Sequence, residues 1–233
     1  IPMFTLSEVQ SPRRAAASIA LLNLGLAGSF VTILLRSPWK LACALVVIAA
    51  LVIYGCELVA ILQARKRRVL DWGIKYFLTA VALYAPLSLL AIVLNWPGLP
   101  SNGVTGQLEN VYGFLGLLGV ISFAIIGMLY KIVPFLVWFG RYSKQIGRAQ
   151  VPALADLYSA KLQALGYWSY LLGLAIVCAA ILPSSETGVR LGAAFLALGV
   201  FALVINIGLM LSHYFAPNLK PLSVQPIPVP KTA

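Results

Sequence analysis

Long uninterrupted apolar runs dominate the chain, with short polar segments between them. Each run is continuously apolar and does not alternate with polar residues, so it is typical of a membrane helix and not of a barrel strand. A helix of about 20 residues crosses a hydrocarbon core roughly 30 Å thick. Six runs of this length lie near residues 15–35, 41–62, 74–94, 111–133, 162–182 and 191–213. The pattern predicts an all-α integral membrane protein with six transmembrane helices.

The composition agrees with this prediction. Hydrophobic residues make up 61% of the chain and charged residues only 10%, and the mean hydropathy is +0.94. A soluble domain of this length cannot bury so many apolar side chains. The lipid bilayer is therefore the first expected partner.

The formal charge of +11 is distributed unevenly over the loops. One set of loops carries thirteen basic residues: Arg13, Arg14, Arg65, Lys66, Arg67, Arg68, Lys75, Arg141, Lys144, Arg148, Lys161, Lys220 and Lys231. The opposite set carries only Arg36, Lys40 and Arg190. This asymmetry indicates membrane topology and does not indicate nucleic-acid binding, and it places the first set on the cytoplasmic side. We expect a cytoplasmic membrane, and specifically a bacterial inner membrane.

Two ionisable residues lie inside apolar runs. Glu57 precedes Arg65 by eight residues, which places it roughly 12 Å from the cytoplasmic charge cluster. Lys131 precedes Arg141 by ten residues and lies at a comparable depth. One hypothesis is that Glu57 and Lys131 pair and hold two helices together. The other is that they handle protons or ions, as in a transporter or permease with its substrate path beside them.

Histidine and cysteine limit the cofactor chemistry. His213 is the only histidine and ends the sixth apolar run. It is interpreted as a hydrogen-bonded structural group, or as one axial haem ligand if its partner comes from elsewhere. Cys43, Cys56 and Cys178 have no paired spacing and predict neither a disulfide frame nor a metal site. No nucleophile–base motif is present, so catalytic residues are unknown and a catalytic centre is not expected in this chain.

The phrase Tyr130 to Phe135, Tyr-Lys-Ile-Val-Pro-Phe, repeats the opening phrase Ile1 to Phe4, Ile-Pro-Met-Phe, at an offset of 132 residues. A basic stretch and a new apolar run follow each phrase. The repeating unit contains four helices, and an even number preserves direction across the membrane. We therefore expect residues 1–14 to be the end of a preceding membrane helix and a basic loop, ahead of a six-helix domain over 15–215.

The prolines at 221, 226, 228 and 230 exclude a regular helix over 216–233 and predict an extended tail. Earlier in the chain, Gly113, Gly116, Gly119 and Gly127 permit close approach of a neighbouring helix.

A resemblance follows from the stretch Tyr112-Gly113-Phe114-Leu115-Gly116 through Gly127-Met128-Leu129-Tyr130-Lys131-Ile132-Val133-Pro134-Phe135. It resembles the catalytic subunit of haem–copper oxidases and related oxidase-like proteins of nitric oxide metabolism, with Gly127, Tyr130 and Pro134 as the structural motif. That family is built from three four-helix arcs, about twelve helices in all. Where the family places a haem-ligating histidine, this chain has Val111 and Tyr112.

The resemblance implies a cofactor-poor accessory or structural subunit of a membrane redox complex in electron transport, such as a respiratory complex. It also fits the later half of a haem-containing oxidase-like protein. In both cases other membrane subunits are expected partners, and any haem would be held by ligands outside this segment. The alternative from the residues alone remains the transporter or permease near Glu57 and Lys131.

Overall fold

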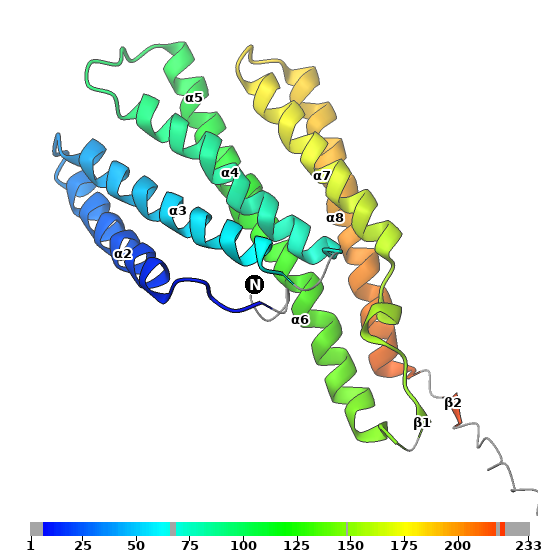
Figure 1. Cartoon of the computed structure of the whole chain (residues 1–233). Helices are drawn as coiled ribbons and strands as arrows, with labels where there is room; N and C mark the ends of the chain where they lie inside the picture. Colours follow the sequence, from blue (N-terminus) through cyan, green and yellow to red (C-terminus); the bar gives the residue numbers. More distant parts are fainter. Residues whose placement is uncertain (1–6, 66–68, 148, 218–219, 222–233) are drawn as a thin grey trace, which may run out of the picture.

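The computed structural model describes residues 7–65, 69–147, 149–217 and 220–221 (Figure 1). Its helices are α2 (Pro12–Leu34), α3 (Lys40–Gln63), α4 (Trp72–Leu94), α5 (Gly103–Phe114), α6 (Ser122–Tyr142), α7 (Ala160–Ile181) and α8 (Glu186–Phe215). A π-helical segment, η1 (Leu115–Ile121), joins α5 to α6, and a 3-10 turn, η2 (Ser143–Gln145), follows α6. Together these four segments form one continuous helix of 43 residues. Six helices within these residues are long and apolar enough to cross a membrane, which confirms the prediction of a helical membrane protein.

The fourth membrane helix extends beyond its predicted bounds at both ends. It begins at Gly103 and not near residue 111, because the Asn102 side chain caps it by accepting the Thr105 amide at 2.9 Å. The first turns contain polar residues, so a hydropathy profile does not detect this part of the helix. At the other end Pro134 is buried inside α6, and the helix continues to Tyr142. Proline removes one backbone donor, but it does not end this helix.

Two antiparallel hairpins flank a central pair of helices. The α2–α3 hairpin packs on one side and the α7–α8 hairpin on the other, with α4 and the long α5–α6 helix between them (Figure 1). The buried core lies mainly between α4, α6, α7 and α8, and includes Tyr76, Phe123 and Met210.

Small residues let the helices of each pair approach closely. A Cβ atom added at Gly173 of α7 would lie 2.7 Å from the Gly192 carbonyl oxygen and 2.7 Å from the Leu196 nitrogen of α8. A Cβ added at Gly25 of α2 would lie 3.0 Å from the Val47 nitrogen of α3. Such backbone contact is the usual way in which membrane helices associate without a hydrophobic driving force.

The central pair uses Gly127 in the same way. A Cβ at Gly127 would lie 2.7 Å from the Gly73 carbonyl oxygen of α4, so the expected close approach at this position is confirmed. The expectation for Gly113 is wrong, since a Cβ there would meet open space within 4 Å. The glycine pattern alone does not show which face of the helix a neighbour covers.

The connection from α6 to α7 contains a two-residue strand, β1 (Ala149–Gln150), and a 3-10 turn, η3 (Leu154–Leu157). Strand β1 pairs antiparallel with β2 (Lys220–Pro221), so these two residues of the tail are extended as predicted. Residues 222–233 and the opening phrase Ile1 to Phe4 lie outside the described residues. The depth of Pro2 therefore stays a prediction.

Candidate functional site

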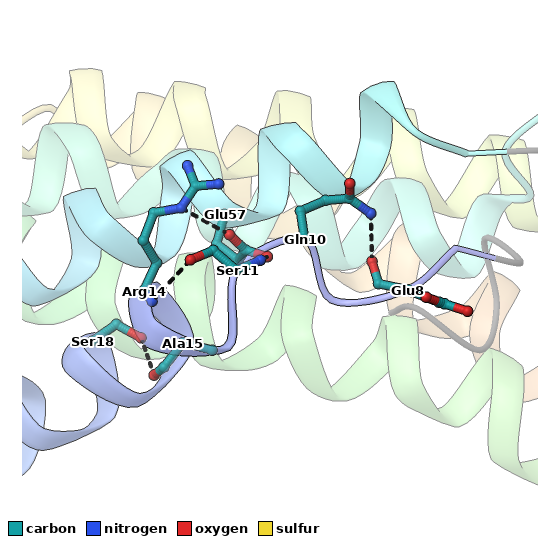
Figure 2. Close-up of polar contacts among 7 residues, drawn as sticks. All are labelled: Glu8, Gln10, Ser11, Arg14, Ala15, Ser18 and Glu57. Carbon is teal, nitrogen blue, oxygen red and sulfur yellow. Dashed lines mark hydrogen bonds and ion pairs between the residues drawn. The ribbon is translucent and has the colours of Figure 1, made fainter.

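Glu57 ties the end of α3 to the start of α2. Its carboxylate is buried, and Oε1 accepts the backbone N–H of Ser11 at 2.8 Å. Its Oε2 lies 3.1 Å from Nε of Arg14, as Figure 2 shows. Ser11 is also the N-cap of α2, and its hydroxyl accepts the Arg14 amide. Glu57 therefore satisfies an amide at the helix start and is itself neutralised by an arginine one turn further on. We call these contacts the Glu57 latch.

Asn206 makes the corresponding contact in the other hairpin, and we call it the Asn206 latch. This side chain of α8 is fully buried, and its Oδ1 accepts the backbone N–H of Ser159 at 2.9 Å. Its Nδ2 donates to the Ser159 carbonyl oxygen at 3.0 Å. Ser159 is the N-cap of α7, as Ser11 is of α2. The residue three positions after this cap is Leu162, where the first hairpin has Arg14.

The two latches are related by an almost constant offset along the chain. Ser159 follows Ser11 by 148 residues, and Asn206 follows Glu57 by 149. The small residues obey the same offset, because Gly173 follows Gly25 by 148 and Leu196 follows Val47 by 149. The Glu57 carboxylate thus accepts the N–H of the cap serine in one hairpin, as the Asn206 amide oxygen does in the other. The additional negative charge of the carboxylate accounts for the additional arginine.

Lys131 has a different partner from the one expected. Its ammonium forms an ion pair with the carboxylate of Asp71, and both side chains are largely buried. Asp71 is the N-cap of α4 and accepts the Ile74 amide at 3.2 Å. The predicted pair between Glu57 and Lys131 is therefore wrong. Depth placed both residues near the same level, but α3 packs chiefly on α2 and α6 packs chiefly on α4.

The other motif residues serve packing between α4 and α6. Tyr130 is buried, and its ring centroid lies 5.6 Å from that of Tyr76 on α4. Tyr76 in turn donates its hydroxyl to the Gln163 carbonyl oxygen of α7 at 3.3 Å. With Gly127 against α4 and Pro134 buried in α6, the motif lies at a close contact between α4 and α6.

His213 lies in the last turn of α8, with its Nδ1 3.1 Å from the Tyr142 hydroxyl of α6. This hydrogen bond gives the imidazole a structural partner, and haem ligation by His213 stays a prediction. Among the residues that the structure describes, no three His, Cys, Asp or Glu side chains converge on a possible metal position. The polar contacts that position the helices form the candidate site.

Sequence reasoning identified Glu57 and Lys131 but missed their partners. The sequence did contain a local indication of these partners, since Ser11-Pro12 and Asp71 are typical of a helix start. Comparison with known protein families, with characterised proteins and with solved structures finds no match. Fold and site together define a class: a helical membrane protein whose hairpins are held by buried polar latches.

Proposed function

We propose that this chain is a structural, cofactor-poor part of an oxidase-like redox complex in a bacterial inner membrane. In this proposal, parallel four-helix repeats stand side by side around an axis along the membrane normal, within a bundle of about twelve helices. The observation that carries the proposal is the correspondence between the Glu57 latch and the Asn206 latch.

The repeat is supported by the helix count between the latches. From the start of α2 to the start of α7 the chain passes through α2, α3, α4 and the continuous α5–α6 helix, which makes four membrane helices. Four crossings return the chain to the same side, so equivalent hairpins have the same direction. Both cap serines are followed two positions later by a basic residue, Arg13 or Lys161. The resemblance of the α6 segment to haem–copper oxidases implies the same repeating unit.

The difference between the two offsets has a simple source. The repeated phrases at Pro2 and Pro134 are 132 residues apart, whereas the latches are 148 or 149 apart. The connection between Pro134 and α7 contains η2, β1 and η3. An insertion of this connection into an otherwise regular repeat accounts for the longer offset.

The ion pairs support a structural role for the buried charges. Glu57 is compensated inside its own hairpin, and Lys131 is compensated by the cap of α4. Arg14 neutralises the buried charge of Glu57 at the start of α2, and Asp71 neutralises that of Lys131 at the start of α4. The two ion pairs therefore favour the structural hypothesis over the permease hypothesis.

Purification of the full-length protein from its native membrane in a mild detergent tests the proposal. We expect a partner membrane subunit to co-purify, and a reduced-minus-oxidised spectrum with haem bands. Gly199→Ala, which would place its Cβ 2.8 Å from that of Tyr170, should reduce the yield of the complex. Gly208→Ala on the same helix meets open space and should not. Protein that purifies with neither a haem spectrum nor a partner subunit would overturn the proposal.

A further inference from the structure

An open groove of about 490 Å³ lies on the outside of the α2–α3 hairpin, beside the Glu57 latch. Two arginines, a cysteine and three aliphatic side chains line it: Arg13, Arg14 and Ala17 of α2, and Val52, Ile53 and Cys56 of α3. The arginines lie where α2 begins, and the other four residues continue along the apolar part of the hairpin. A groove with cations at one end and apolar side chains along the rest has the same division as a phospholipid.

Position along the helices places the two arginines at the membrane surface. Helix α2 has 23 residues, so at 1.5 Å per residue it is roughly 34 Å long, slightly longer than a hydrocarbon core of about 30 Å. Arg13 and Arg14 are its second and third residues, and their long side chains reach the headgroup layer. Val52 precedes Gln63, the last residue of α3, by eleven residues, and therefore lies roughly 16 Å from that end, at the depth of acyl chains.

The protein itself does not fully neutralise the cations of this groove. Nε of Arg14 contacts Glu57 at 3.1 Å, and Figure 2 shows both terminal nitrogens of that guanidinium pointing away from the carboxylate. In the part of the chain that the structure describes, these two nitrogens and the Arg13 guanidinium have no hydrogen-bond or ion-pair partner. The Glu8 carboxylate points away from Arg14 in the same view (Figure 2). One positive charge thus lacks a counterion, and a guanidinium with free terminal nitrogens is well suited to phosphate oxygens.

The α7–α8 hairpin has different residues at the positions of the groove. The offsets that relate the two latches place Leu165 at the position of Ala17 and Ile205 at that of Cys56. That hairpin also has one basic residue where the first has two, because a leucine takes the place of Arg14. The small side chains of the first hairpin are therefore not needed for the close helix contact that both hairpins share. They leave space in the hairpin that has the additional cation.

We propose that this groove binds an anionic phospholipid, whose phosphodiester oxygens accept hydrogen bonds from Arg13 and from the terminal nitrogens of Arg14. One acyl chain lies against the apolar side chains between α2 and α3. Basic pockets between membrane helices are a recurrent kind of site for anionic headgroups. The bound lipid supplies the missing counterion and covers the outer side of the Glu57 latch. This site goes beyond the proposed structural function and does not depend on it.

The test uses purified full-length protein in phosphatidylcholine nanodiscs that contain a small, non-saturating fraction of phosphatidylglycerol with a diazirine in one acyl chain. After photolysis, mass spectrometry should locate crosslinks at residues 13–20 and 52–56. Arg13→Leu should lower their yield about fivefold, and it removes no contact within the described part of the protein. Lys161→Leu is the matched control, because it removes the same charge at the corresponding position of α7 and should leave these crosslinks unchanged.

Two further variants test the second arginine and the groove itself. Arg14→Leu/Glu57→Gln removes the cation together with the buried carboxylate, so the fold keeps no unpaired charge, and the yield should again fall about fivefold. Ala17→Leu/Cys56→Ile introduces the side chains of the second hairpin and should lower the yield to a similar extent. Ala16→Leu, at an exposed position of α2 outside the groove, should not.

Four results would overturn the proposal. Equal crosslinking by a diazirine phosphatidylcholine would show that the charge of the headgroup is not recognised. Equal losses in Arg13→Leu and Lys161→Leu would show only a general attraction between the basic surface and anionic lipid. An unchanged yield in Ala17→Leu/Cys56→Ile would exclude the groove as the site. Displacement of the probe by an equal concentration of inorganic phosphate would identify a free anion, and not a lipid, as the ligand.

Discussion

The Glu57 latch allows a quantitative prediction in which the two partners are unequal. The Glu57 side chain is 5% exposed, whereas that of Arg14 is 46% exposed. Glu57→Ala removes the acceptor of the Ser11 amide and leaves Arg14 free to extend towards headgroups or water. We expect a cost of about 1–3 kcal/mol, the usual penalty for a buried donor without a partner. Arg14→Leu leaves a buried carboxylate without its cation, and this costs on the order of 3–5 kcal/mol.

The Asn206 latch shows how the stability lost in Arg14→Leu can be recovered. In that hairpin an amide bonds to the cap serine and Leu162 takes the place of Arg14. The double variant Arg14→Leu/Glu57→Gln copies this chemistry at the original side-chain length. Because replacing a buried ion pair as a whole is often nearly neutral, the double variant should be within about 1 kcal/mol of the native protein. It should therefore be more stable than Arg14→Leu alone.

Reversible unfolding in mixed micelles by titration with sodium dodecyl sulfate, followed by circular dichroism, measures these free energies. The two single variants and the double variant form a double-mutant cycle. Arg13→Leu is the matched control, since it removes an exposed neighbouring arginine and should change stability by no more than about 0.5 kcal/mol. Additive losses, or an Arg14→Leu variant no less stable than Glu57→Ala, would refute the reasoning.

Three other results are expected. Gly173→Ala should cost about 1–3 kcal/mol of unfolding free energy because α7 and α8 must separate, whereas Gly113→Ala should be neutral or slightly stabilising; equal effects would disprove the close contact. Asn206→Leu leaves the Ser159 amide without its acceptor, whereas the Ser159 carbonyl oxygen still accepts the Gln163 amide, and should cost about 1–3 kcal/mol in the same titration, so a neutral result would remove the Asn206 latch as a stabilising feature. A single cysteine at position 67, in a background without Cys43, Cys56 and Cys178, should react only with a reagent on the cytoplasmic side, and external labelling would reverse the topology.

The helices could be predicted from the sequence because an apolar run of membrane length has few alternatives in hydrocarbon. Five of the six predicted helices start and end within five residues of the bounds that the structure gives. The fourth membrane helix, α5–α6, differs most, since polar residues of its first turns resemble a loop in a hydropathy profile. The predicted end at residue 133 is also wrong, because the helix continues through Pro134 to Tyr142 without the one backbone hydrogen bond that proline cannot donate.

The partners of the buried charges needed the tertiary structure. Glu57 is 43 residues from Arg14 and 74 from Lys131, and sequence depth alone cannot choose between them. The choice follows from which helices form a hairpin, since the close contact at Gly25 brings the start of α2 against the end of α3. The correspondence between Glu57 and Asn206 also could not be predicted from the sequence, because the two residue types differ. They correspond only in that each side chain accepts the N–H of a cap serine. Helix formation is local and is specified by the apolar runs, whereas charge pairing is a property of the packed hairpin.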